Sequence, residues 1–192
     1  MPADFAEVLA FWFGAPDSPA LGRRRAEWFE RNPGFDAEIA ARFLKTYDAG
    51  AAGRLALWER TPLASLALIV VLDQFSRNMF RGAPRAFAAD PIALDAARRA
   101  IDNGFDSVLR PVERMFLYLP FEHSEDLAAQ RRSLRLFATL AEESGAVDNY
   151  DYARRHYDII ARFGRFPHRN AALGRESTAP ELEFLKQPGS SF

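Results

Sequence analysis

The chain has 192 residues, of which 48% are hydrophobic, and its 25 basic residues nearly balance its 26 acidic residues. This length suits one domain with a sizeable core, and the near-neutral charge argues against a protein that binds nucleic acid through bulk electrostatics. Because the chain has no cysteine, disulfides, iron–sulfur clusters, thiolate zinc sites and cysteine nucleophiles are excluded.

The first third of the chain is predicted to be helical. Apolar side chains recur at helical spacing over residues 3–13, 20–31 and 35–48. Asp36 could cap the third of these helices. The small residues at 49–53 break the pattern, and residues 54–60 form at most a short helix.

The stretch Thr61–Gly82 stands out because its apolar first half changes abruptly to charged residues. Its opening threonine and proline are typical of an N-cap and a first helical position. A helix that is apolar on all faces belongs in the middle of a domain. Asp73, Arg77 and Arg81 follow at intervals of four, so they share one helical face. The pattern predicts a buried helix whose end presents charge to a cleft.

The apolar run Leu63–Leu72 is too short to cross a bilayer, which takes about 20 residues. The N-terminus carries acidic residues where a signal peptide would be positively charged. We therefore expect a soluble, cytoplasmic protein with no membrane partner.

The second half of the chain predicts more helices, which run from an Asp90 cap to about Asn103, from Pro111 onward, over 125–143, over 149–163 and from Thr178 onward. Pro120 should kink or interrupt its helix, and Asp148 could cap the helix over 149–163. Thr178 and Glu181 have capping-box spacing. The tail from Gln187 should fray. Since no segment alternates as a strand does, residues 1–192 are predicted to form one all-α domain.

Three polar clusters interrupt the aromatic background, at 73–82, 121–127 and 162–178. In the first cluster, Arg77 and Arg81 would repel each other unless an anion or carboxylates lie between them. Asp73 and Arg77 could instead form an ordinary intrahelical pair.

In the second cluster, Glu122, Glu125 and Asp126 share a face if the helix resumes after the proline. His123 is the candidate general acid or base, paired with Asp126 or Glu122. A metal site would use His123, Glu122 and a histidine from elsewhere, but the HExxH spacing is missing, so we expect no metal and no other cofactor. Alternatively, the carboxylates pair with arginines of the other clusters and hold the helices together, with Glu122 or Glu125 as partners of Arg77.

The third cluster is a polar loop with constrained residues, which is more typical of a functional segment than of a connector. Its candidate ligand-binding residues are Arg165, His168, Arg169 and Asn170. The predicted ligand-binding set also includes residues of the other two clusters, namely Asp73, Arg77, Arg81 and Glu125. His156, just before it, lies on an apolar helical face and is interpreted as a core histidine.

These clusters carry a family resemblance. The segments that do so are LDQFSRNMFRG, AFAADPIAL, FLYLPFEHSEDL and HYDIIARFGRFPHRNAALGREST. Together they resemble the bacterial proteins catalogued as domain of unknown function 924, from about Phe11 to Leu185. The resemblance implies a tetratricopeptide-like α/α superhelix, a fold that periodicity alone does not specify. It implies no catalytic residues, because the function of that family is unknown.

Two functions follow from these observations. The first is a cleft that binds a small anionic or polar ligand and could carry out acid–base chemistry, without a metal. The alternative is a tetratricopeptide-like scaffold that grips a peptide or protein partner, with the clusters acting as a structural ion-pair network. No nucleic acid is expected as a partner, and the sequence leaves the oligomeric state open.

Overall fold

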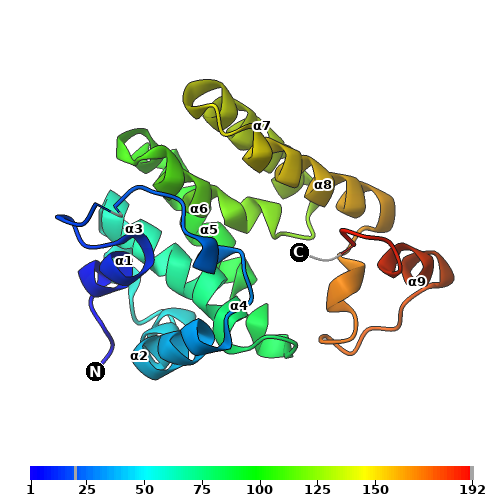
Figure 1. The fold of residues 1–192 in the computed structure, drawn as a ribbon, viewed down its shortest axis with the longest axis horizontal. Helices are drawn as coiled ribbons and strands as arrows, with labels where there is room; N and C mark the ends of the chain where they lie inside the picture. Colours follow the sequence, from blue (N-terminus) through cyan, green and yellow to red (C-terminus); the bar gives the residue numbers. More distant parts are fainter. Residues whose placement is uncertain (20, 191–192) are drawn as a thin grey trace.

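A computed structural model describes residues 1–19 and 21–190, which form helices and turns without a β-strand (Figure 1). The α-helices are α1 (Phe5–Phe13), α2 (Pro33–Ala51), α3 (Pro62–Ile69), α4 (Ser76–Met79), α5 (Asp90–Asp102), α6 (Pro111–Glu122), α7 (Leu127–Ser144), α8 (Val147–Phe163) and α9 (Ala179–Leu185). Short 3-10 helices are η1 (Ala26–Trp28), η2 (Ala56–Arg60), η4 (Pro84–Ala86), η5 (Phe105–Val108) and η6 (Pro167–Arg169), and a π-helical segment, η3 (Val70–Phe75), joins α3 to α4. The predicted all-α class is confirmed.

Helix α3 lies in the centre, as its sequence predicts. It packs against α1, α5 and α6, and its Leu66 and Ile69 side chains are fully buried. A helix without a polar face can be stable only where every side meets another element. The buried position of the start of Thr61–Gly82 is therefore confirmed.

Aromatic rings fill the space between α1, η3 and α6. The Trp12 ring lies 5.5 Å from Phe75 and 5.4 Å from Phe116 between ring centroids, and both contacts are edge-on. All three side chains are buried. Burial of each ring contributes about 1.5–3 kcal/mol, and edge-on ring pairs add specificity.

Helices α6, α7 and α8 pack side by side in chain order, and α9 lies against η6 at the C-terminal end (Figure 1). Gly145 ends α7 and Gly164 ends α8 in the left-handed region, with φ values of 73° and 69°. A glycine adopts this conformation without the steric cost that a Cβ imposes. These two turns direct the loop after α8 back toward α6.

The predicted helix over 20–31 is wrong, since only η1 forms there. Gly22 has a φ of +78° and Arg25 is extended. The Arg25 guanidinium donates to the carbonyls of Phe11 and Trp12 in the last turn of α1, at 2.7 and 3.0 Å, and so caps that helix. This tertiary contact outweighs the local helical pattern. Ala20 lies outside the described residues.

Helix α2 differs from its prediction at both ends. Asn32, whose side chain accepts from the Phe35 N–H at 3.1 Å, is the cap in place of Asp36. The helix also continues into the expected break at 49–53, because Gly50 packs closely on η3. A Cβ at Gly50 would lie 3.2 Å from a methyl carbon of Leu72.

The other boundaries mostly follow the sequence. Pro120 lies inside α6 without interrupting it, and α8 begins at Val147, so Asp148 is not its cap. The capping box of Thr178 and Glu181 is confirmed, with the Thr178 N–H donating to the Glu181 carboxylate at 2.7 Å.

Residues 186–190 form turns and bends after α9. The Ser190 hydroxyl is buried and donates to the Leu185 carbonyl at 3.1 Å. Residues 191–192, where fraying was also predicted, lie outside the described residues. No helix in the described part of the chain is both long and apolar enough to span a membrane.

Candidate functional site

The π-helical segment η3 brings polar side chains into the interior. Asp73 is fully buried on it, and the Gln74 amide donates to Asp73 Oδ2 at 2.6 Å. A π-helical turn shifts the register of the side chains that follow, and such turns occur often at functional sites. Here the turn lies where the apolar run becomes polar.

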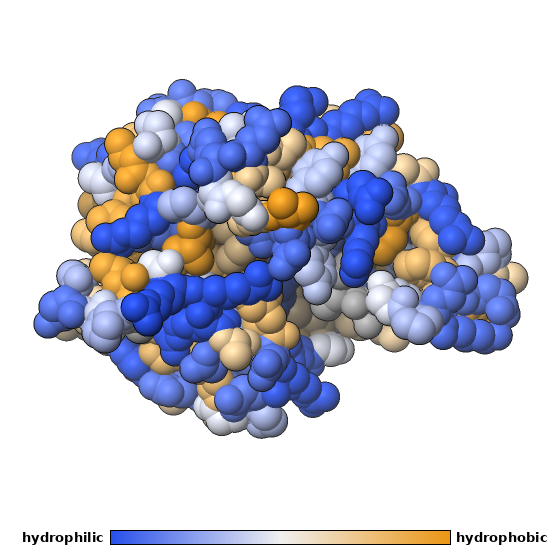
Figure 2. All heavy atoms as spheres, turned by 45° about the horizontal axis from the view of Figure 1, so that its top comes forward, coloured by the Kyte–Doolittle hydropathy of each residue, from blue (hydrophilic) through white to orange (hydrophobic). Residues whose placement is uncertain are grey.

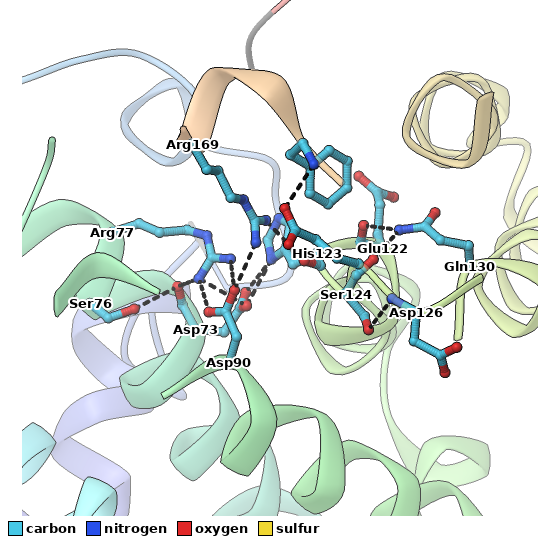
Figure 3. Close-up of polar contacts among 12 residues, drawn as sticks. Asp73, Ser76, Arg77, Asp90, Glu122, His123, Ser124, Asp126, Gln130 and Arg169 are labelled. Atoms are coloured by element: carbon cyan, nitrogen blue, oxygen red, sulfur yellow. Dashed lines mark hydrogen bonds and ion pairs between the residues drawn. The ribbon is translucent and has the colours of Figure 1, made fainter. Parts of the chain in front are cut away.

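Two aspartates and two arginines form a buried ion-pair network beside this turn (Figure 3). Arg77 donates to both oxygens of Asp90, at 2.9 and 3.0 Å, and lies 3.2 Å from Asp73. Arg169 lies 3.2 Å from Asp90 and donates to the His123 carbonyl at 2.9 Å. Burial, together with the charge of Arg77, lowers the pKa of Arg169 to about 10. The network therefore joins η3, α4, α5, α6 and η6.

His123 contacts Asp73 and not a carboxylate of its own cluster. Its Nδ1 lies 2.7 and 2.9 Å from the two Asp73 oxygens. Although burial alone would raise it, the pKa of Asp73 is lowered by Arg77 and by His123. An ionised carboxylate can only accept, so Nδ1 carries the hydrogen and Nε2 keeps its lone pair. Burial, then the charge of Arg77, lowers the pKa of His123, which favours this neutral form.

Glu122 is a buried carboxyl group that forms no ion pair with an arginine or lysine in the part of the chain that the structure describes. Within the described residues its one ion-pair partner is His156, whose Nδ1 lies 3.1 Å from Glu122 Oε1. Burial, and then the charge of Asp73, raises the pKa of Glu122 to about 8. His156 Nδ1 also donates to the Tyr152 carbonyl at 2.9 Å, and burial lowers the pKa of His156 well below its usual value. One ligand atom each of Glu122, His123 and His156 lie within 4.8 Å of one another.

These three residues line a cavity of about 610 Å³. Its wall also carries four guanidinium groups, from Arg24, Arg77, Arg81 and Arg169. Aromatic side chains cover other parts of the wall, namely Trp28, Phe29, Phe87, Phe137 and Tyr152. Pockets of a few hundred to about 1,000 Å³ with apolar walls and a few convergent polar groups are typical of small-molecule sites.

The outer surface has a different character. Figure 2 shows hydrophilic side chains over much of one face, with hydrophobic side chains in small groups between them. Exposed hydrophobic residues that are scattered in this way are normal for a protein surface.

Several predicted site residues meet at the cavity or in the network behind it. They are Asp73, Arg77, Arg81, Glu122, His123, His168 and Arg169. Arg77 pairs with Asp90 and Asp73, so the predicted pairing with Glu122 or Glu125 is wrong. Arg81 does not share a helical face with Asp73 and Arg77, because α4 ends at Met79. It pairs instead with Asp36 of α2, at 2.6 Å.

The predicted pairing of His123 with Asp126 is also wrong. Asp126 is the N-cap of α7, and its carboxylate accepts from the N–H groups of Ala128 and Ala129 at 3.1 and 3.2 Å. Its side chain points away from His123 in Figure 3. Since α6 ends at Glu122, the two residues do not share a helical face.

The remaining candidate residues form contacts within the C-terminal loop, residues 164–178, or bind to it. Glu125 binds Arg175 at 2.7 Å and accepts from the Phe166 N–H at 2.7 Å. Arg165 pairs with Glu181 at 2.6 Å, and the Asn170 amide donates to the Ser177 hydroxyl at 3.0 Å. These contacts anchor the loop that carries His168 and Arg169.

The sequence interpretation missed Asp90, Gln74 and Arg24, and it placed His156 only in the core. Asp90 was interpreted as a helix start, and it does lie in the first turn of α5. The usable signal was the number of buried arginines in the clusters, because each needs a carboxylate. His156 is buried as expected, but its ring also reaches the cavity wall.

Comparisons with known proteins agree with the resemblance seen in the motifs. A family model described as a bacterial protein of unknown function, DUF924, matches residues 8–189. A solved structure of a protein of unknown function from Agrobacterium tumefaciens, ATU0120, is similar, with 38% sequence identity and a TM-score of 0.83. The alignment covers 96% of this chain and 97% of that one. The comparison with curated proteins gives no match.

Proposed function

The chain belongs to the DUF924 family of bacterial proteins of unknown function, and we propose that it binds a small organic anion in its cavity of about 610 Å³. The observation that carries this proposal is the separation of charge around the wall. Arg77, Arg81 and Arg169 line the cavity, whereas their carboxylate partners Asp73, Asp90 and Asp36 are not part of the lining. A ligand in the cavity therefore meets the guanidinium side of these pairs.

Two arginines have hydrogen-bonding capacity to spare. The Arg169 Nε–H is buried and has no hydrogen-bond partner in the described part of the chain. Arg24 forms no ion pair there and lies 4.5 Å over the Phe29 ring. A buried donor without a partner is costly, so an acceptor supplied by a ligand would be stabilising. Guanidinium groups bind carboxylate and phosphate oxygens in the same plane, often through two bonds.

The aromatic part of the wall indicates what the rest of the ligand is. Trp28, Phe29, Phe87 and Tyr152 offer flat apolar surface close to the arginines. An amphipathic ligand with an acidic head and an apolar or aromatic body would satisfy both parts of the wall.

Three probes of matched size and different charge test the proposal. They are 3-phenylpropionate, its neutral amide and the cationic 3-phenylpropylamine. We expect the anion alone to raise the melting temperature of the metal-free protein in a saturable way, because only binding to the folded state stabilises it. An equal effect of the amide, or a larger effect of the amine, would overturn the proposal.

A matched pair of variants locates the binding. Arg24→Ala should weaken binding of 3-phenylpropionate several-fold, consistent with about 1 kcal/mol for an exposed charged contact. Arg23→Ala removes a neighbouring arginine that is also exposed but is not part of the cavity lining, and it should leave binding unchanged. Equal effects of the two variants would indicate non-specific charge attraction.

The alternative proposal is a tetratricopeptide-like superhelix that grips a peptide on a concave face. In such arrays each repeat contacts only its neighbours. Here α3 contacts α1, α5 and α6, and the polar clusters meet around one cavity instead of following a groove. Both observations favour the small ligand. A peptide scaffold would be supported if none of the three probes bound.

A further inference from the structure

The geometry points to a binding site for one divalent transition-metal ion at Glu122, His123 and His156. The inference goes beyond the binding of an organic anion and does not depend on it. It begins with the donor set, because two imidazoles and one carboxylate are what zinc and ferrous iron bind in many enzymes.

The three donors are already close together. One ligand atom of each lies within 4.8 Å of the others. Two ligand atoms that each lie about 2.1 Å from a tetrahedral metal ion are about 3.4 Å apart, so side-chain rotations that shorten the longest separation by up to about 1.4 Å would complete the set. Glu122 and His123 are adjacent at the end of α6, and His156 lies on α8, so two separate helices hold the donors.

Both histidines are oriented in the way that metal ligands are. The Nδ1 of His123 faces the Asp73 carboxylate at 2.7 Å, and the Nδ1 of His156 donates to the Tyr152 carbonyl at 2.9 Å. Each of these contacts fixes the hydrogen on Nδ1 and leaves Nε2 free to bind a metal. Because Glu122 Oε1 lies 3.1 Å from the Nδ1 of His156, the Glu122 carboxyl group has to turn from this contact to share an ion with Nε2. A histidine that ligates a metal almost always donates its other N–H to a carboxylate or a carbonyl, which orients the ring.

A metal would also resolve the charge balance of Glu122. This side chain is 4% exposed, and within the described residues its one ion-pair partner is a histidine. Buried carboxylates are generally paired with a cation or coordinate a metal. The carboxylates of Asp73 and Asp90 are different, since arginines already compensate them.

The site is open on one side. All three residues line the cavity of about 610 Å³, so the protein supplies three ligands and leaves coordination positions toward the cavity. Three protein ligands with open positions are typical of catalytic metal sites, whereas structural zinc sites are closed by four. A carboxylate or phosphate held by the arginines of the same wall could complete the coordination.

The competing interpretation is proton transfer without a metal, with Asp73 orienting His123 as a general base. It uses the same hydrogen bond between Asp73 and His123. It leaves unexplained why Glu122 and His156 converge on that histidine. The two interpretations differ in whether the protein alone binds a metal.

Titration of the chelator-treated full-length protein with Co²⁺ tests the proposal. We expect one equivalent to bind and visible absorption bands of a low-symmetry Co²⁺ site to appear, and Zn²⁺ to displace it with the same stoichiometry in calorimetry. If the wild-type protein binds neither ion below millimolar concentration, the proposal is overturned. This result would leave the binding of 3-phenylpropionate by metal-free protein unaffected, so the two proposals fail separately.

Variants then locate the ion. His123→Ala and His156→Ala should each weaken Zn²⁺ binding at least 100-fold, while His168→Ala, which removes the third histidine of the wall, should change it less than threefold. Asp73→Asn should weaken binding about 10–100-fold and keep the stoichiometry, as expected for a positioning residue. Circular dichroism establishes that each variant is folded. Full-strength binding by folded His123→Ala and His156→Ala variants would refute the site.

Discussion

Asp90 is the carboxylate that Arg77 and Arg169 share in the buried ion-pair network. Its replacement by asparagine should destabilise the fold strongly. Three guanidinium hydrogen bonds reach its carboxylate, at 2.9 and 3.0 Å from Arg77 and at 3.2 Å from Arg169. A charge-assisted hydrogen bond contributes about 1.5–3 kcal/mol, so the three set an upper limit of roughly 9 kcal/mol. Asparagine keeps one acceptor oxygen, but it leaves Arg77 and Arg169 without their shared counter-charge.

Removal of one partner from a buried ion pair typically costs about 3–5 kcal/mol, and we expect a loss in this range for Asp90→Asn. Urea unfolding followed by circular dichroism measures it, as a lower midpoint with an unchanged slope. Asp95→Asn is the matched control on the same helix, because Asp95 pairs with Arg98 at the exposed surface, and it should cost less than about 0.5 kcal/mol. A loss below about 1 kcal/mol for Asp90→Asn would refute the network as a determinant of stability.

Two further predictions concern the core and the C-terminal loop. Phe75→Ala should lower the free energy of unfolding by about 3–5 kcal/mol, because the fully buried ring lies 4.8 Å from Phe43 and 5.5 Å from Trp12; a loss below about 1.5 kcal/mol would contradict this packing. The hydrogen bonds from Arg165 hold the pKa of Glu181 down to about 2 from its ordinary value of 4.5. The stabilisation is therefore present above pH 4.5 and is lost as the pH falls toward 2. The melting-temperature advantage of the wild type over Glu181→Gln should accordingly shrink from pH 6 to pH 3, and a constant difference would contradict the assigned cause.

The central helix could be predicted from sequence because its signal is local and unambiguous. The apolar run after Thr61 and Pro62 has no polar face, so a helix there must be surrounded by other elements. Helix α3 does lie in the middle of the structure. The segment 20–31 had an equally helical pattern and does not form a long helix. The contact that prevents a long helix there joins Arg25 to the end of α1. A contact between residues so far apart in the chain cannot be predicted from the spacing of apolar residues.

The residues of the site could also be predicted in part, because their signal in the sequence is local. Polar residues inside an aromatic background identified Asp73, Arg77, Glu122, His123 and Arg169, which do come together. The pairing could be read from the sequence only in part. Chain spacing predicts the Asp73–Arg77 pair, which forms at 3.2 Å, whereas the contacts of Arg77 with Asp90, of His123 with Asp73 and of Arg169 with Asp90 span 13 to 79 residues.

The expectation that no metal binds also depended on the spacing of residues along the chain. The sequence predicts no metal because two histidines at HExxH spacing are absent. In the structure the second histidine comes from α8, and Glu122 and His123 are adjacent in the chain. Two neighbouring residues can both reach one point because they lie at the end of α6, where the backbone leaves the helix.

The buried polar residues fall into two groups according to their partners. Asp73, Asp90, Arg77 and Arg169 compensate one another, whereas Glu122, with His123 and His156, forms the group that we propose binds a ligand. Such a group is costly to stability, since burial without a cationic partner opposes the ionisation of a carboxyl group.

The unfolding free energy of metal-free Glu122→Gln tests this division most directly. The account predicts that urea unfolding will find the variant at least as stable as the wild type, by as much as about 1–3 kcal/mol, because an amide is less costly to bury than a carboxyl group that ionises. A loss of about 2 kcal/mol or more would contradict it, since Glu122 would then belong to the structural network together with Asp90.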